Sequence, residues 1–455
     1  MIQIIIGIII TIIAILAVSV FSGKTVKTKK ANSVVVAGAI MGTLVGGSST
    51  VGTAQLAYEY GMSAWWFTLG AGIACFILAF VYAKPFHRSG HKTLMGFITD
   101  EYGKKNGVLA SVFSSVGSFI NIISQLIAAT AIIAVVFPDL SLTFSLLISA
   151  IIMILYIIFG GVKGSGLVGS LKMFLLYASM VATGILVLRL SGGLSGFGNL
   201  VNKIDNQANI NFYSLFARGW GEDLGACISL ILGVITTQSY AQAIFAAGNE
   251  KQAVKGALIG SVLIPPIGIG GILVGLYMRA VHPGIMSKTA LTYFVTQYMP
   301  PLLSGVVLGA LYIAIVGTGA GLALGIAIMI KNDVLPLFKN RVKIIEKITE
   351  KKLIIVVLML ACVLSMGPLG DTILDFAFMS MGLRGATVFV PLCFAIFCRG
   401  RVCDKYAMFS IIAGPVTVLL FNMLRVLPFD PLFAGVLVSG IIMLAGAGKN
   451  REKEI

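Results

Sequence analysis

Residues 41–53 read MGTLVGGSSTVGT, so that four glycines and five hydroxyl side chains interrupt an otherwise apolar run. Adjacent glycines and serine or threonine side chains weaken the hydrogen-bond ladder of a helix and free backbone carbonyls. Inside a bilayer, such backbone is tolerated only against protein or a water-lined cavity. A broken helix at mid-depth is typical of a transporter site, because freed carbonyls can bind a cation. Close helix packing through small residues is the alternative interpretation.

The composition places this segment in a membrane. The chain has 455 residues, of which 58% are hydrophobic and 11% charged, and its mean hydropathy is +1.00. Soluble domains carry about 25% charged residues, so an ordinary soluble enzyme is excluded. We expect an all-α integral membrane protein with about 13 transmembrane helices. The expected spans are 2–22, 33–60, 62–83, 107–136, 142–160, 165–189, 225–247, 256–279, 302–330, 353–367, 372–398, 406–424 and 431–447.

Positive charges alternate between the loops. Loops after odd-numbered spans hold 25 of the 33 lysines and arginines, and even-numbered loops hold 6. The positive-inside rule therefore predicts a multi-pass protein of the cell membrane with its N-terminus outside and its C-terminus in the cytoplasm. The net charge of +16 then reflects cytoplasmic loops beside the lipid bilayer, and no nucleic-acid partner is expected.

Motifs of catalysis are absent from the sequence. It contains no Walker motif, serine-hydrolase elbow or HExxH helix. Five of the six cysteines lie in apolar spans, and the three histidines lie in loops, so neither a disulfide framework nor a cysteine–histidine metal site is indicated. The sequence therefore predicts a protein that is not an enzyme.

Several segments together resemble the sodium:solute symporter family. The run Gly46–Ala54 with Tyr58–Gly61 looks like the first core helix of that family. Three further matches follow in the family's order along the chain, namely Thr93–Ile98 with Glu101–Gly103, Gly160–Gly161 taken as the loop before the sixth span, and Tyr240–Gln242 with Ala246–Ala247. Each motif alone is short, but their order and spacing extend the resemblance over nearly the whole chain.

The resemblance implies a LeuT-type fold with a core of two inverted five-helix repeats. The implied division is a peripheral N-terminal helix in 1–32, a first repeat in 33–190, an extracellular connection in 191–224, a second repeat in 225–398 and two peripheral helices in 399–455.

The resemblance also implies a sodium site between the first and eighth core helices. Carried over by motif, its ligands are the carbonyls of Ser48 and Val51 with Ala314 and Thr318. The family usually has a hydroxyl residue where this chain has Gly317. That departure removes one hard oxygen ligand from the expected site. No other cofactor is expected.

A second departure concerns Gly169 and Lys172, which stand where the family typically has Asp and Gln. An ionisable residue within a span is a functional candidate by default. Our hypothesis is that the Lys172 ammonium occupies or competes for the cation position, which would give proton coupling or cation-independent transport. The alternative is that Lys172 snorkels to the cytoplasmic interface.

Uncharged polar residues in the core spans are the candidates for binding a solute. Asn121 and Gln125 lie one turn apart on one helix face. The full set is Gln55, Tyr58, Asn121, Gln125, Thr237 and Gln238. These amides and hydroxyls suit a sugar, an amino acid or an organic acid, and hydrogen bonds between helices are the alternative role.

Arg384 lies deep in the eleventh span, where it could clamp a substrate carboxylate. We prefer a structural pairing with Asp375 or a helix C-terminus, because buried charges in spans usually find a protein partner. Glu59 lies near the outer end of its span, where water can hydrate it.

Two classes of function remain open. The first is cation-coupled symport of a small polar solute by alternating access, with sodium or protons as the coupling ion. The second is a channel or membrane sensor that keeps the symporter fold without coupled transport.

Overall fold

A computed structural model describes residues 2–25, 31–208, 210–338, 348–367, 373–424 and 429–447. The basic residues expected in loops at 27–30, 339–347 and 449–453 lie outside this part. The α-helices are α1 (Ile2–Thr25), α2 (Ser33–Leu44), α3 (Thr53–Tyr60), α4 (Trp66–Ile77), α5 (Ala83–Ser89), α6 (Gly96–Tyr102), α7 (Lys104–Val136), α8 (Leu142–Leu190), α9 (Gly193–Ala208), α10 (Trp220–Ile235), α11 (Gln238–Phe245), α12 (Glu250–Leu263), α13 (Pro265–Val281), α14 (Ala290–Tyr298), α15 (Pro301–Met329), α16 (Glu350–Ser365), α17 (Ile373–Phe397), α18 (Asp404–Leu424) and α19 (Pro431–Gly446).

Short 3₁₀ and π-helical turns complete the described secondary structure. The π turns are η1 (Ser48–Gly52), η3 (Leu78–Tyr82) and η5 (Ile330–Val334), and the 3₁₀ turns are η2 (Gly61–Trp65), η4 (Ser287–Thr289) and η6 (Leu335–Leu337). Within the described ranges there is no β-strand, only two isolated bridges. The expected all-α membrane fold is confirmed.

Seven helical segments of the described chain are long and apolar enough to cross a bilayer, and the bent pair α10–α11 makes an eighth. Shorter apolar helices include α2 and α19. The expected number of 13 spans is not confirmed by this count. The family-like loop expected at Gly160–Gly161 is wrong, because α8 runs through both glycines as one helix of 49 residues. Both spans expected in this region, 142–160 and 165–189, lie within its bounds.

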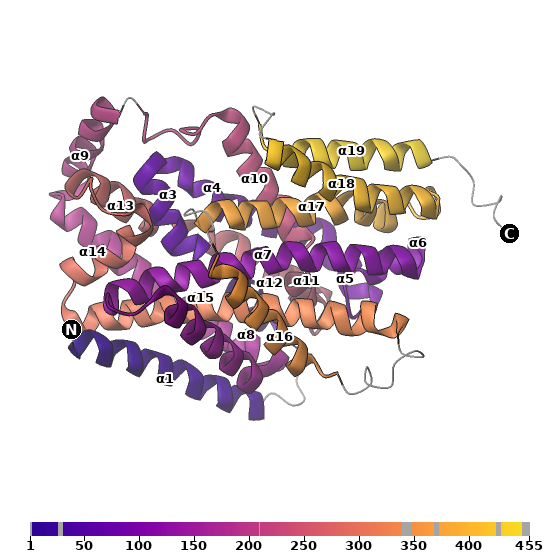
Figure 1. The fold of residues 1–455 in the computed structure, drawn as a ribbon, viewed down its shortest axis with the longest axis horizontal. Coiled ribbons are helices and arrows are strands. Elements are labelled where there is room, and N and C mark those ends of the chain that lie inside the picture. Colours follow the sequence, from indigo (N-terminus) through magenta and orange to yellow (C-terminus); the bar gives the residue numbers. More distant parts are fainter. Residues whose placement is uncertain are drawn as a thin grey trace.

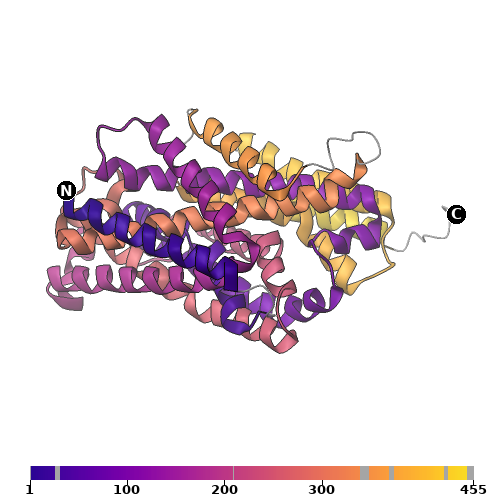
Figure 2. The ribbon, with the colours of Figure 1, turned by 90° about the horizontal axis from the view of Figure 1, so that it is seen from below.

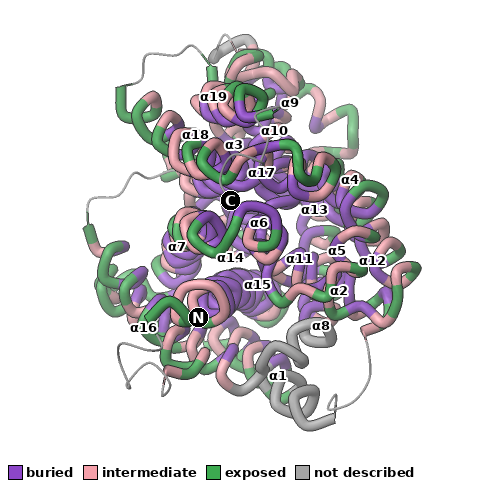
Figure 3. Tube along the Cα trace, turned by 90° about the vertical axis from the view of Figure 1, so that its right-hand side faces the viewer, coloured by how far each residue is buried: buried purple, intermediate pink, exposed green. Residues whose placement is uncertain are grey.

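Helix α15 forms the centre of the molecule. Its residues from Ser304 to Met329 are buried almost without exception, and Figure 3 shows it surrounded by the other helices. A helix that is apolar on every face is stable only when other helices or lipid enclose it. Helix α1 lies diagonally across α15 in Figure 2. Gly7 and Gly305 permit this contact, because a Cβ at either position would collide with backbone of the other helix.

The loops sort to opposite ends of the molecule. In Figure 1, α9 and α14 lie at one end of the long axis and α6 lies at the other. The alternation of positive charge predicts that α9 and α14 lie outside and that α6 lies in the cytoplasm. The separation of these helices agrees with the alternation of positive charge along the loops. Which end of the molecule faces the cytoplasm stays a prediction.

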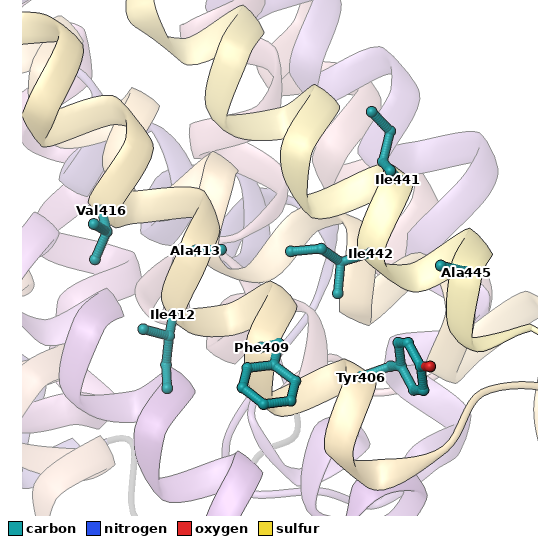
Figure 4. A pocket seen from close by; sticks show the side chains of 8 residues that line it. All are labelled: Tyr406, Phe409, Ile412, Ala413, Val416, Ile441, Ile442 and Ala445. Atoms are coloured by element: carbon teal, nitrogen blue, oxygen red, sulfur yellow. The ribbon is translucent and has the colours of Figure 1, made fainter.

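Apolar side chains cover the outer surface of α18 and α19. A groove between these two helices is lined by Tyr406, Phe409, Ile412, Ala413, Val416, Ile441, Ile442 and Ala445, and Figure 4 shows their side chains along it. Exposed apolar residues of this kind are stable against lipid.

Two helix breaks position the candidate site. Helix α2 ends at Leu44, and its continuation resumes in η1 and α3 after the non-helical residues 45–47. The second break lies between α10 and α11, whose axes differ by 44° around Thr236 and Thr237. Freed backbone groups at both breaks must find partners inside the protein.

Candidate cation and solute sites

The break after α2 is closed in by its neighbours. A Cβ at Gly46 would lie 2.5 Å from Thr318 Oγ1 and 2.7 Å from Gln125 Oε1, and one at Gly47 would collide with Ala128. Glycine is therefore required here because α7 and α15 approach the backbone directly. The same closeness brings polar groups of α7 and α15 within reach of the freed peptide groups.

Gln125 of α7 holds the break. Its Oε1 accepts a hydrogen bond of 2.8 Å from the Gly47 N–H, and its Nε2 donates to Ser48 Oγ at 3.1 Å. Nε2 also lies 3.1 Å from Asn121 Oδ1, one turn away as expected. The Gln125 amide thus binds both a freed backbone N–H and a hydroxyl. Loss of such hydrogen bonds in an apolar core destabilises the protein.

Hydroxyl side chains satisfy the freed carbonyls of the same segment. Thr50 Oγ1 donates to the Gly46 carbonyl at 2.8 Å, and Thr53 Oγ1 donates to the Ser48 carbonyl at 3.2 Å. Val51 lies in the π turn η1 and is buried. The two carbonyl residues proposed from the motif are therefore part of the break, and the Ser48 carbonyl is used within it.

The Lys172 side chain lies at the start of the break. Only 1% of Lys172 is exposed, so snorkelling to the interface is wrong. Its Nζ donates to the Gly42 carbonyl at 2.5 Å and to Thr318 Oγ1 at 3.0 Å. Thr318 Oγ1 in turn donates to the Val45 carbonyl at 3.1 Å. The ammonium and Thr318 thus connect α8 and α15 to the broken end of α2.

The carbonyls beside the ammonium are those of Gly42 and Val45, N-terminal to Ser48 and Val51. Gly169 explains how α8 comes so close, since a Cβ there would collide with the Gly38 carbonyl of α2. The Asp that the family carries at position 169 has no room in this packing. Ala314 lies buried on α15 one turn before Thr318.

Arg384 of α17 is fully buried at the second break. Its Nη1 donates to Thr237 Oγ1 at 2.7 Å, and its Nη2 donates to Ser380 Oγ at 3.0 Å. Nε donates to the Ser380 carbonyl and Nη2 also contacts Met381 Sδ. In the described part of the chain all partners of Arg384 are uncharged, so the preferred pairing with Asp375 is not observed.

The remaining solute candidates are spread over three places. Gln55 accepts a hydrogen bond from the Ile373 N–H at the start of α17, beside the first break. Tyr58 donates to the His282 carbonyl, and the Arg279 guanidinium lies over its ring. Gln238 accepts from the Leu94 N–H at 2.7 Å and donates to the Lys92 carbonyl, which fastens the segment before α6. Tyr58 and Gln238 therefore lie apart from the group around Gln125.

Sequence reasoning missed three groups of the site. The carbonyls of Gly42 and Val45 carry no side-chain signal. Tyr156 lies near the ammonium, because its hydroxyl and Lys172 Nζ would lie 3.2 and 3.3 Å from a Cβ on Gly317.

Comparisons with known proteins identify the family and the fold. The model of the sodium:solute symporter family matches residues 25–414. The symporter YwcA of Bacillus subtilis (strain 168), described as uncharacterized, is 28% identical over 171 residues, which cover 37% of this chain and 32% of that protein. The matched region thus spans about a third of that relative.

Two solved structures share the fold. One is a Na⁺-coupled sialic acid symporter in a substrate-bound outward-open state, with a TM-score of 0.75, 17% identity and 97% of each chain covered. The other is Mhp1, a nucleobase-cation-symport-1 family transporter in a closed conformation, with a TM-score of 0.61, 13% identity and 93% of this chain and 94% of that chain covered. The structure therefore has the LeuT-type fold, and the chain belongs to the sodium:solute symporter family.

Proposed function

We propose that this protein is a secondary active transporter that couples movement of a small polar organic solute to a cation gradient. The observation that carries the proposal is the broken α2–η1–α3 segment, whose polar groups meet Gln125 and Thr318 inside an apolar helical core. A polar break in the core supplies a binding site at mid-depth, as alternating-access carriers require. The family implies sodium as the coupling ion, and Lys172 with Gly317 makes the proton the alternative.

The two breaks give the proposed motion its structural basis. We propose that residues 33–190 and 225–398 are the two inverted repeats, that 191–224 connects them outside the cell, and that 1–32 and 399–455 are peripheral. Each repeat then contributes one broken helix, α2–α3 or α10–α11. Rocking of one repeat against the other around the breaks would open the site to each side in turn. From the charge of the loops, we also propose that the N-terminus lies outside the cell and the C-terminus in the cytoplasm.

Arg384 favours an organic acid over a sugar as the solute. A guanidinium buried among uncharged groups is costly in a membrane unless an anion joins it. Its partners Thr237 and Ser380 are hydroxyl groups that can also bind a carboxylate. A small carboxylate would therefore neutralise the charge at the second break, and the guanidinium fork matches its two oxygens.

Uptake into proteoliposomes tests the proposal. The purified full chain is reconstituted and given radiolabelled small carboxylates, sugars and amino acids under an inward proton gradient and, separately, an inward sodium gradient. We expect at least one carboxylate to accumulate above its external concentration by about tenfold with one gradient, and an uncoupling ionophore to abolish the accumulation. Equilibration without accumulation would favour the channel, and no movement would favour the sensor.

A further inference from the structure

We infer that the Lys172 ammonium replaces the sodium ion of the family's site, so that this transporter does not bind or require sodium. The inference rests on the proposed function, because it concerns the cation chemistry of that same site. It starts from three helices that meet at one buried positive charge, namely α8 with Lys172, the broken end of α2 and the centre of α15.

The ammonium shares one of the four expected sodium ligands, Thr318, and takes the Gly42 carbonyl as its second oxygen. It lies 2.5 Å from the Gly42 carbonyl and 3.0 Å from Thr318 Oγ1. These oxygens come from the broken helix and from α15, the two elements between which the family resemblance places sodium. An ammonium has three N–H donors and binds oxygens at such distances. Lys172 therefore joins α2 to α15 as a cation would, but through a covalent link to α8.

Sodium does not fit beside this lysine. In its protonated form, Lys172 would weaken the binding of a cation about 4 Å away by about a thousandfold at an effective dielectric constant of about 20. No described carboxylate forms an ion pair with Lys172 to offset this repulsion. The Asp of the family is replaced by Gly169, which has no room for a side chain against the Gly38 carbonyl.

Gly317 also disfavours a sodium ion at this site. A hard cation needs several oxygen ligands, and position 317 offers no hydroxyl. A Cβ at this position would lie 3.3 Å from Lys172 Nζ and 3.2 Å from the Tyr156 hydroxyl. The space that a serine side chain would need is therefore next to the ammonium. The absence of a hydroxyl at Gly317 and the presence of the Lys172 amine therefore affect the same position.

Binding of ²²Na⁺ to the purified full chain tests the inference without any assumption about the solute. In a scintillation proximity assay, we expect no ²²Na⁺ signal that excess unlabelled NaCl displaces from the wild type. The double variant Lys172→Gln with Gly317→Ser removes the charge and restores a hydroxyl, and we expect it to gain displaceable binding. The variant Lys251→Gln removes an exposed lysine and should behave as the wild type.

The wild-type measurement decides the matter even if the double variant does not fold. Displaceable ²²Na⁺ binding by the wild type would overturn the inference, as would uptake that falls more than about tenfold when choline replaces sodium. A monodisperse double variant that binds no sodium would also contradict it. Each of these results leaves the proposed transport intact, whereas absence of accumulation under any gradient would refute transport and leave the sodium result unaffected.

Discussion

Replacing Arg384 by glutamine is expected to lower kcat/KM for uptake of a carboxylate by about a hundredfold or more. The guanidinium is fully buried, and its described partners are uncharged, so the bound carboxylate would be its main counter-charge. Removing one member of a buried charge pair costs about 2–5 kcal/mol. Glutamine keeps a hydrogen-bond donor for Thr237 but carries no charge.

Two comparisons separate binding from folding at this position. Arg384→Lys keeps the positive charge but loses the planar guanidinium that binds both carboxylate oxygens, so uptake should fall less, by about tenfold. The melting temperature of Arg384→Gln should stay near or above that of the wild type, because an uncompensated buried charge is removed. Carboxylate uptake by Arg384→Gln at the wild-type rate would refute the role of Arg384 in binding the solute.

Replacing Gln125 by leucine is expected to lower uptake by about tenfold or more and to destabilise the protein. The side chain is 1% exposed and binds both the Gly47 N–H and Ser48 Oγ. Leucine cannot bind either group; Ser48 Oγ keeps its contact with Ser124 Oγ, but the Gly47 N–H loses this buried partner, which costs about 1–3 kcal/mol. The break would then lose the contact that fixes its shape.

A matched control for this experiment is Thr130→Val on the same helix. Among the described residues, Thr130 donates to the Ile127 carbonyl of its own helix α7, so its loss should leave uptake within about twofold of the wild type. Uptake and thermal unfolding are measured on both variants. A Gln125→Leu protein that transports normally would show that Gln125 does not hold the break.

The first break could be predicted from the sequence because its signal is local. Gly46, Gly47 and the following hydroxyl residues weaken a helix wherever they occur, and the structure interrupts α2 at that place. The second break carried less signal, since Thr236 and Thr237 alone do not end a helix. Only the fold places α10 and α11 at an angle around them.

The contacts of Lys172 could not be predicted from the local sequence. Its depth within the span was visible, but its partner Gly42 is 130 positions away. Their meeting depends on Gly169 packing against α2 at Gly38, a match between two helices that no local pattern encodes. The motif instead suggested the carbonyls of Ser48 and Val51.

Two further errors have physical reasons. The loop predicted at Gly160–Gly161 is wrong because glycine is tolerated within membrane helices, where the backbone must satisfy its hydrogen bonds inside the protein. The preferred pairing of Arg384 with Asp375 is not observed among the described residues, and the hydroxyls of Thr237 and Ser380 accept hydrogen bonds from the guanidinium instead. The two charges are nine positions apart on one helix, which places them on opposite faces and about 13 Å apart along its axis.

Water access to the broken segment tests the central claim most directly. In a chain whose six native cysteines are replaced by serine, Ser48→Cys is exposed to a membrane-impermeant methanethiosulfonate reagent in proteoliposomes. We expect Ser48→Cys to be labelled, and a transported solute to slow the labelling, while Ile441→Cys on the outer face of α19 stays unlabelled. A folded Ser48→Cys protein that the reagent does not label, with or without any of the gradients, would contradict a solvent-accessible site at this break.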